Sequence, residues 1–493
     1  MQDACRDASG DPGGDPSGGL PLSAARPRLV PVSSRDLDSA SVASVPPETA
    51  TAGGVLSPQF RWTSIGMCLL ITLAAFEALA VTTIMPTVSR ELDGSALYAF
   101  AFAGPLAVGV VGMVSAGAWA DRGNPRTALI ASVVLFAAGL SIAGTAPTMW
   151  VFVAGRLVHG LGGGALTVVL YVIVARVYPP VLHPRIFAGF AAAWVIPSLI
   201  GPFIAGVLSE TVGWRWVFLG VVALAALAML MVVPVMRRVL RAGERAPFRA
   251  ARLVWAVLLA VAVLALTLAA ESRGPVLWIV PPLAAIVAVL ALRPLVPKGT
   301  LLARRGLPSV ILMRGIIAAT FFATEVYVPL LMVSQYGLSA AVAGLALTAA
   351  GLTWSAASWV QGRFPGITHL VAARLGALGL TIALTSLIAT AVWHLNPFIV
   401  VVGWAFSGGG MGILYPRLGV LTLEYSTPAD QGFNSSALTI ADSTGSAVAL
   451  AATAIVFAAL RAFSGGWPFA GAFTVTAVLC ALAWLFAPRL RRT

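Results

Sequence analysis

The chain has 493 residues, of which 59% are hydrophobic and 10% are charged, and its formal net charge at pH 7 is +13. Soluble domains have an apolar share near about 45 to 50%, so this composition excludes a water-soluble protein and predicts a chain that crosses the membrane many times. Basic residues that bind nucleic acid cluster on one soluble face, whereas here they recur in short gaps between apolar segments. We therefore expect no nucleic-acid partner and interpret the charge as a signal of membrane topology.

Residues 1–60 precede the first apolar segment and are rich in Asp, Gly, Pro and Ser, with few large hydrophobic side chains. Such a segment cannot bury enough surface to offset the entropy lost on ordering. The prediction is a disordered cytoplasmic tail. A cleaved signal peptide is not expected, because the first apolar segment begins only after this long polar leader and is long enough to span a bilayer.

Fourteen apolar segments reach the length of about 20 residues that one helical crossing requires. They begin near residues 63, 96, 127, 149, 186, 214, 253, 275, 310, 340, 371, 397, 434 and 467. The pair that begins near 253 and 275 is the weakest, and without it the count is twelve. Nineteen basic residues fall in the gaps and terminus assigned to the cytoplasm, against four in the opposite gaps, Arg90, Arg215, Arg273 and Arg461. This bias predicts cytoplasmic termini and an even number of spans, in the cell (plasma) membrane.

The spans and basic gaps predict three regions after the tail. Residues 61–236 hold six spans, residues 237–309 hold basic linkers with two extra spans, and residues 310–493 hold six spans and a short cytoplasmic tail. Two six-span halves with a substrate site between them recur among secondary transporters. The predicted fold class is an all-α polytopic membrane protein with two six-helix bundles, two extra spans between them, and 14 transmembrane helices.

Glu77 lies in the first span, within the apolar segment LLITLAAFEALAVTTIMP. At 1.5 Å per helical residue it is about 13 Å from the outer end of that span at Pro86. A charged side chain at such depth costs about 2.5 to 3.5 kcal/mol on insertion scales, so an ionisable residue there indicates a function. The alternative is a neutral or hydrogen-bonded packing residue.

The gap after the second span reads GAWADRGNPR, residues 117–126. It resembles the signature loop of the major facilitator superfamily, G-x-x-x-D-R-x-G-R-[KR]. The matching positions are Gly117, Asp121, Arg122 and Arg126. Asn124 and Pro125 depart from the pattern. The resemblance implies the major facilitator fold and a gating role for this loop, while the alternative is an ordinary polar turn.

The fourth span contains GRLVHGLGGGA, residues 155–165, which resembles the superfamily's R-x-x-x-G signature. Arg156 lies about 10 Å into the span, and an arginine at that depth needs a partner or a wet cavity. A structural ion pair is the alternative to a functional role. Gly160 and Gly164 are expected to permit close helix packing, and His159 is expected to be a hydrogen-bonded core residue.

The fifth span reads PSLIGPFIAG, residues 197–206, and resembles the antiporter signature G-x-x-x-G-P-x-x-G-G. It retains Gly201, Pro202 and Gly206, and in the family this motif marks export by exchange. Frequent use of Gly and Pro in membrane helices is the alternative. Residues 214–218 and 327–345 are similar to the fourteen-span drug:proton antiporter branch of the superfamily.

That branch carries an acidic residue nine positions before a proline in its first span, as Glu77 is before Pro86. Because Glu77 and Arg156 reach similar depths in the same half, we hypothesise that they interact and compete for a proton. Glu325 and Asp442 are two further carboxylates within spans, and we include both as candidates for proton coupling or the substrate cavity. Burial favours the neutral form of a carboxyl group and a nearby arginine favours the ionised form, so access and pairing can switch a proton on and off.

The remaining charged residues in spans, Arg314, Arg417 and Glu424, lie nearer the inner ends. We interpret them as structural, with Arg314 reaching toward the interface. The dispersed cysteines and histidines favour neither a disulfide framework nor a metal site, and no nucleophile constellation or GKS/GKT loop indicates an enzyme, a cofactor or ATP.

The predicted function is proton-coupled export of small amphipathic organic molecules across the lipid bilayer, by alternating access. The alternative is a symporter or facilitator that takes up a metabolite with the same fold.

Overall fold

The computed structural model describes residues 54–122, 125–179, 182–239, 250–269, 275–364, 367–427 and 430–491. The predicted disordered tail lies outside these residues, except for the short segment that leads into the first helix. Within the described ranges the regular structure is helical and contains no strand. This arrangement agrees with the predicted all-α class, since a helix satisfies its backbone hydrogen bonds internally where no water is present.

The helices follow the apolar segments closely along the chain. Their bounds are α1 Arg61–Glu91, α2 Phe100–Arg122, α3 Pro125–Gly144, α4 Met149–Val177, α5 His183–Leu208, α6 Arg215–Val239, α7 Ala250–Leu268, α8 Pro275–Leu292, α9 Leu307–Glu325, α10 Tyr327–Tyr336, α11 Ala340–Arg363, α12 His369–Trp393, α13 Phe398–Glu424, α14 Gln431–Ala459 and α15 Trp467–Phe486. Short helical turns include the 3-10 helix η1, Ser95–Leu97, and the π-helical turn η3, Ser209–Gly213.

Thirteen segments among the described residues are long and apolar enough to cross a membrane. Helices α9 and α10 together make one of these spans, Leu307–Tyr336. The predicted span near residue 275 corresponds to α8, Pro275–Leu292, and the side chains described there give a shorter apolar helix over Ile279–Leu295. The thirteen spans among the described residues lie at predicted positions, and α8 lies at the position of the fourteenth.

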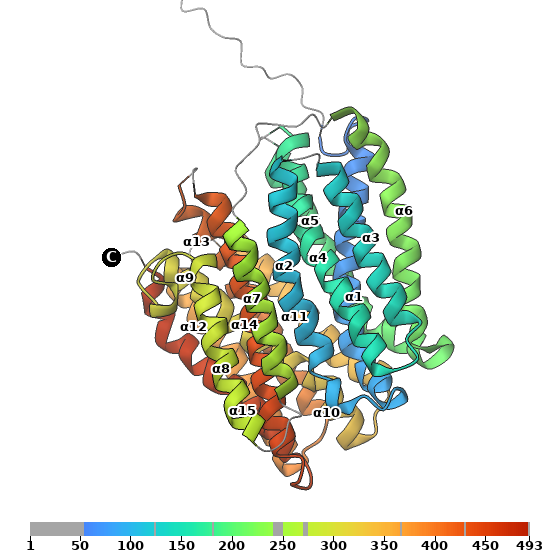
Figure 1. The fold of residues 1–493 in the computed structure, drawn as a ribbon. Helices are drawn as coiled ribbons and strands as arrows, with labels where there is room; N and C mark the ends of the chain where they lie inside the picture. The colour runs from blue at the N-terminus through green and yellow to red at the C-terminus, as the bar shows by residue number, and fades with distance from the viewer. Residues whose placement is uncertain are drawn as a thin grey trace, which may run out of the picture. The chain divides into compact units, whose positions relative to one another are not determined.

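The helices pack in two groups that lie side by side (Figure 1). In the first group, α4 packs between α2 and α3, and α1 packs against α5 and α6. In the second group, α13 packs between α11 and α12, and α9 packs against α14 and α15. We call these the N-group, α1–α6, and the C-group, α9–α15. Contacts between them run along α5 with α11 and along α2 with α14, and α7 contacts both α2 and α14.

Glycines allow α4 to lie unusually close to its neighbours. A Cβ atom on Gly160 would lie 2.4 Å from the Cα atom of Pro105, and one on Gly164 would lie 2.1 Å from the carbonyl oxygen of Gly109. Both distances are too short for a side chain, so only glycine fits at these positions. The packing role predicted for Gly160 and Gly164 is confirmed.

The contact between α5 and α11 has the same character, and two residues of the antiporter-like motif lie directly on it. A Cβ atom on Gly206 would lie 2.5 Å from the Cα atom of Ala341, and one on Gly344 would lie 2.9 Å from the carbonyl oxygen of Pro202. Gly201 instead lies near the ring of Phe76 on α1. These glycines let the two groups meet backbone to backbone.

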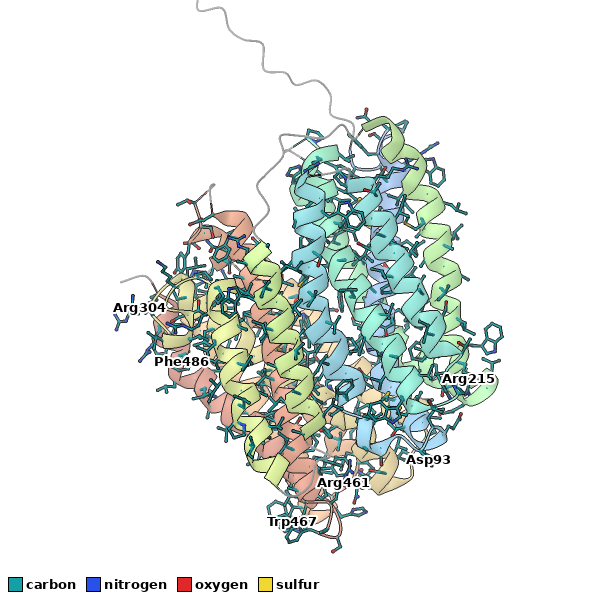
Figure 2. All side chains as sticks on the ribbon, viewed as in Figure 1. Asp93, Arg215, Arg304, Arg461, Trp467 and Phe486 are labelled. Carbon is teal, nitrogen blue, oxygen red and sulfur yellow. The ribbon has the colours of Figure 1, made fainter. Side chains whose placement is uncertain are left out.

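Three polar contacts join the groups at the end of the bundle where Asp93, Arg215, Arg461 and Trp467 lie (Figure 2). We call this the Asp93 end, and the opposite one the Arg304 end. The Tyr98 hydroxyl donates to the carbonyl of Val326 at 3.0 Å, and Arg461 donates to the carbonyl of Ser95 at 3.3 Å. The third contact runs from the Ala341 amide to the Glu210 carboxylate at 2.8 Å.

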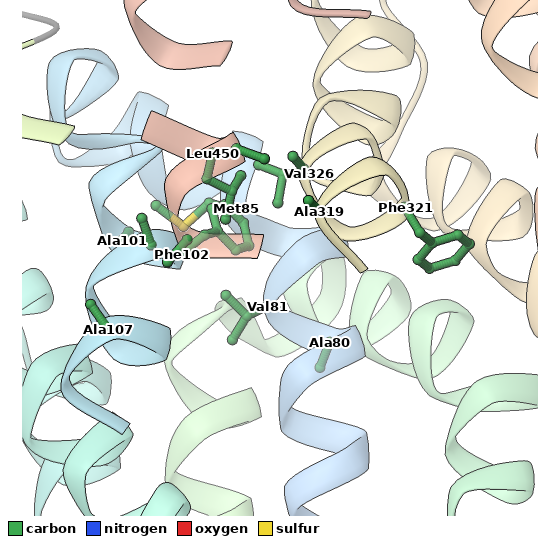
Figure 3. Close-up of a cluster of buried hydrophobic side chains, with 14 of the residues drawn as sticks. Ala80, Val81, Met85, Ala101, Phe102, Ala107, Ala319, Phe321, Val326 and Leu450 are labelled. Carbon is green, nitrogen blue, oxygen red and sulfur yellow. The ribbon is translucent and has the colours of Figure 1, made fainter. Parts of the chain in front are cut away.

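Apolar side chains add to this junction. One buried cluster contains side chains from both groups (Figure 3). It includes Met85 of α1 and Phe102 of α2 from the N-group, and Val326, between α9 and α10, and Leu450 of α14 from the C-group. The groups are thus held by both apolar packing and hydrogen bonds near the Asp93 end.

Candidate functional site

Glu77 is buried inside the N-group, where its carboxylate contacts the guanidinium of Arg156 from α4. The predicted contact between Glu77 and Arg156, which was based on their similar depths in the spans, is therefore present. Both are almost fully buried, with side-chain exposures of 5 and 6%. A buried ion pair of this kind strongly resists loss of one partner, because the remaining charge would be left uncompensated in an apolar interior.

Arg156 has a second partner that the local sequence of α2 provides. Its Nε atom donates to the carbonyl of Ala101 at 3.2 Å. In an α-helix that carbonyl would accept from the residue four positions later, which is Pro105, and proline has no backbone N–H to give. Pro105 therefore leaves an acceptor unoccupied within the helix, and the arginine uses it.

His159 completes the cluster. It lies three residues after Arg156, so both side chains project from the same face of α4. The Nη1 atom of Arg156 lies 3.2 Å from Nδ1 of His159, and His159 Nε2 lies 3.2 Å from Oε2 of Glu77. Because a guanidinium can only donate, the Nδ1 atom in this contact is the acceptor, which leaves the ring proton of a neutral imidazole on Nε2. That nitrogen lies near Glu77 without the alignment of a hydrogen bond.

The sequence pattern predicted a core position for His159 but not its contact with Glu77. The ring does pack on Phe136, with centroids 4.6 Å apart, so the packing role is real but incomplete. The three-residue spacing from Arg156 was the signal that could have placed it beside Glu77.

The chemical capacity of this cluster follows from its arrangement. One carboxylate has one cationic partner, and that partner has two other acceptors within reach, the Ala101 carbonyl and His159 Nδ1. A proton on Glu77 would remove the charge that holds Arg156 to α1 while leaving the arginine hydrogen-bonded to α2 and to its own helix. The ion pair between α1 and α4 therefore depends on the charge of Glu77.

A second charged cluster lies in the C-group and corrects one prediction. Arg314 of α9 does not reach the interface; its Nη2 atom lies 3.4 Å from Asp442 Oδ2, and its Cζ atom lies 3.1 Å from the ring centroid of Tyr415. The Tyr415 hydroxyl donates to the same Asp442 oxygen at 2.5 Å. Side-chain packing against α13 and α14 holds the guanidinium inside the protein.

Asp442 keeps one oxygen unused. Its Oδ1 atom is buried and has no hydrogen-bond partner among the described residues. A buried acceptor without a hydrogen bond is costly. Among the described residues Asp442 forms an ion pair with Arg314 and accepts a hydrogen bond from Tyr415, and the structure does not bring it to Glu77.

Glu325 is different from both, because no ion pair or hydrogen bond to its side chain is found in the described part of the chain. It is the last residue of α9 and is buried. Pro329 lies four positions later, so the helix loses a hydrogen bond here and breaks between α9 and α10. Tyr98 binds the carbonyl of the next residue, Val326, at this break.

The predicted gating loop is described only in part. Gly117 lies in α2 opposite Val168 of α4, with room for ordinary contact. Arg176 of α4 donates to the carbonyl of Ala120 at 2.8 Å, near the end of α2. Arg126 lies in the first turn of α3. The side chains of Asp121 and Arg122, and residues 123 and 124, lie outside the described set.

No group of three or more His, Cys, Asp or Glu side chains is placed to hold a metal ion within the ranges that the structure describes. The charged clusters above combine carboxylates with arginines, which compete with a cation for the carboxylate oxygens. Among the described side chains these clusters are held by ion pairs and hydrogen bonds.

Comparison with known proteins identifies the family. The family model described as the Major Facilitator Superfamily matches residues 67–395. The chain therefore belongs to the major facilitator superfamily, a family of multi-pass membrane transporters.

Several relatives share parts of the sequence. Multidrug resistance protein 3 of Bacillus subtilis is 23% identical over 304 residues, which is 58% of each chain. A Mycobacterium tuberculosis protein named "Probable multidrug-efflux transporter" is 30% identical over 191 residues, 38% of this chain and 40% of that one. An uncharacterized transporter of Schizosaccharomyces pombe is 29% identical over 153 residues, 31% of this chain and 26% of that one. The chain thus spans between a quarter and 58% of the length of these relatives.

Solved structures share the fold. A POT family transporter superposes with a TM-score of 0.65 at 15% identity, covering 87% of this chain and 96% of that one. A D-xylose-proton symporter gives a TM-score of 0.63 at 14% identity, covering 87% and 98%. At such low identity these likenesses extend to the helix arrangement alone.

Proposed function

We propose that this protein is a proton-coupled transporter of the fourteen-span drug:proton antiporter branch, which exports small amphipathic organic molecules from the cytoplasm. The observation that carries the proposal is Glu77, a buried carboxylate whose single cationic partner, Arg156, has two alternative acceptors. Relatives named for multidrug resistance and efflux support the choice of substrate class.

The proton cycle centres on Glu77. A proton that binds Glu77 neutralises it, and Arg156 then remains with the Ala101 carbonyl and His159. Loss of the proton restores the ion pair between α1 and α4. Because a charge buried without a partner is costly, each protonation state favours its own arrangement of the three helices. Asp442 and Glu325 are further candidates for proton or substrate binding in the C-group.

The transport cycle alternates which end of the bundle is open. Contacts at the Asp93 end hold the N-group and C-group together in this structure. The bias of basic residues between the gaps supports a cytoplasmic position for the Arg304 end, with both termini on that side. Opening the Asp93 end requires α5 to separate from α11, and the motif Gly201, Pro202 and Gly206 is proposed to set how tightly these helices close. Gly117, Asp121, Arg122 and Arg126 are proposed to latch the Arg304 end.

The predicted regions 61–236, 237–309 and 310–493 then correspond to a proton-binding bundle, a connecting region with two additional helices, and a second bundle. The contacts within the N-group and within the C-group are compatible with this division.

Everted membrane vesicles test the proposal directly. Vesicles acidified inside are loaded with a pH-sensitive dye, and a panel of amphipathic dyes, antibiotics and metabolites is added outside. An antiporter moves substrate inward and protons outward, so a transported compound raises the luminal pH. Glu77→Gln should abolish this response while the protein still folds, and Glu424→Gln, which changes an exposed carboxylate at the end of α13, should retain it.

Two results would contradict the proposal. A compound that lowers the luminal pH on entry indicates symport, and accumulation without any proton movement indicates facilitated diffusion. Undiminished coupling in the Glu77→Gln protein would remove Glu77 from the proton pathway.

A further inference from the structure

A cavity of about 370 Å³ lies between the two helix groups at the Asp93 end. The N-group contributes Ser89, Ser95 and Tyr98, and the C-group contributes Tyr327, Phe457 and Arg461, among others. Pockets for small organic ligands have volumes of about 300 to 1,000 Å³, so this cavity can hold a compound with one or two rings. It lies apart from the buried clusters around Glu77 and Asp442, none of whose residues line it.

The floor of the cavity is the contact that joins the groups. Tyr98 and Tyr327 both line it, with ring centroids 6.4 Å apart, and the Tyr98 hydroxyl is bound to the Val326 carbonyl. Tyr98 is buried, and its hydrogen bond to Val326 joins the two groups beside the cavity.

The walls are aromatic. Phe457 and Phe469 lie edge to face with centroids 5.1 Å apart, and Tyr327 packs on Phe457 at 5.2 Å. Phe463, in the loop between α14 and α15, lines the same cavity and is 59% exposed. Such rings provide flat apolar surface for an aromatic body, at low cost in side-chain entropy.

The charge that lines the cavity is positive. Arg461 is its charged lining residue, and no acidic side chain of the described chain lines it. The guanidinium is directed across the junction, since it donates to the Ser95 carbonyl of the opposite group. Around it stand the hydroxyl groups of Ser89, Ser95 and Ser334 and the amide of Gln335, which can bind oxygen atoms. Arginine is the side chain best suited to a carboxylate.

We propose that this cavity is a binding site for small aromatic carboxylates, with the ring system packed against Phe457, Phe463 and Phe469 and the carboxylate bound by Arg461. A ligand there contacts both groups at once and stabilises their closed junction at the Asp93 end. The site itself is independent of the proposed export activity. Only its assignment to the outer face of the membrane, and hence a role as a site where external anions slow transport, rests on the proposed function.

The test measures binding and needs no transport. The full chain is reconstituted in lipid nanodiscs, and 2-naphthoate is titrated by calorimetry with empty nanodiscs as the reference. We expect saturable binding of 2-naphthoate, with 2-naphthylmethylamine, the cationic analogue, at least about tenfold weaker, a difference of about 1.4 kcal/mol.

Two variants change the site in different ways, and a third serves as the control. Arg461→Gln should weaken 2-naphthoate about tenfold, and Ser334→Trp should abolish binding by filling the cavity, because Ser334 is exposed and its hydroxyl binds only its own helix at Leu330. Arg90→Gln removes an equal charge from an exposed arginine at the same end that does not line the cavity, and should bind as the unaltered protein does.

Absence of saturable binding, equal affinity for the amine, or unchanged binding in both cavity variants would overturn the proposal. A single monodisperse peak in size-exclusion chromatography establishes that each variant is folded. Binding with the expected pattern would stand even if no proton-coupled export were found.

Discussion

Arg156 of α4 donates to the Ala101 carbonyl of α2, an acceptor that Pro105 leaves unoccupied within its own helix. Pro105 thus makes the Ala101 carbonyl of α2 available to bind the buried guanidinium of Arg156. The arginine is therefore held to α2 whatever the state of Glu77, and only its contact with α1 depends on the charge of that carboxylate.

The ion pair itself can be tested by a double-mutant cycle. Arg156→Met should destabilise the protein by about 3 to 5 kcal/mol, because it leaves a carboxylate buried without a partner. Adding Glu77→Gln removes that charge and should recover much of the loss. Apparent melting temperatures of the single and double variants in detergent provide the measurement, and costs that simply add would show that the two residues do not interact.

The second prediction separates two roles of His159, packing against Phe136 and accepting a hydrogen bond from Arg156. His159→Phe keeps a ring against Phe136 but removes the acceptor for Arg156, so we expect a near-normal melting temperature and at least a severalfold loss of substrate-driven proton movement in vesicles. His159→Gln restores an acceptor oxygen and should retain most activity. Equal activity in the Phe and Gln variants would assign His159 to packing alone.

The close approach of α5 and α11 predicts a sharp contrast between two glycines. Gly206→Ala places a Cβ atom 2.5 Å from the Cα atom of Ala341, so the helices must move apart, and transport should fall at least severalfold. Gly220→Ala in α6 is the matched control, because nothing lies within 4 Å of its added Cβ atom, and it should be neutral or slightly stabilising. Transport rates at equal protein amounts decide the matter, and equal rates would count against a closing role for this contact.

Tyr98 provides a fourth prediction, on the junction between the groups. Tyr98→Phe removes the hydrogen bond to Val326, worth about 0.5 to 1.5 kcal/mol, and should increase the population in which the groups are apart at the Asp93 end. Spin labels at Asp93 and Trp467, on opposite groups, would report this as a longer distance component (Figure 2). Tyr336→Phe is the control, since that hydroxyl bonds to Leu395 within the C-group. A distance distribution that matches the control would show that the bond does not hold the junction.

Much of the fold could be predicted because each helical crossing of a membrane requires about 20 consecutive apolar residues. Predicted spans near 149, 340 and 467 begin at Met149, Ala340 and Trp467. The predicted span near 275 likewise begins at Pro275 of α8. The depth of a residue also follows from counting along a helix, which is why the amino-acid sequence alone could match Glu77 with Arg156.

The direction in which a side chain points around its helix was harder to predict than its depth along the helix. Arg314 lies near the start of α9, where a long side chain can reach the interface, yet it turns inward onto Tyr415 and Asp442. That choice depends on partners from two helices more than 100 residues later in the chain. The contact of Tyr98 with Val326 is equally non-local, and neither residue carries a motif that would reveal it.

The position of α7 has a consequence for the symmetry of the bundle. Because α7 contacts both α2 and α14, the seam between the groups on that side is covered by a third helix, with α8 packed on α7 in turn. In the described chain neither α7 nor α8 packs against α5 or α11, so the seam between those two helices is not covered in this way. The bundle is therefore asymmetric: an additional helix covers the seam between the groups on one flank, whereas on the other flank α5 and α11 meet backbone to backbone.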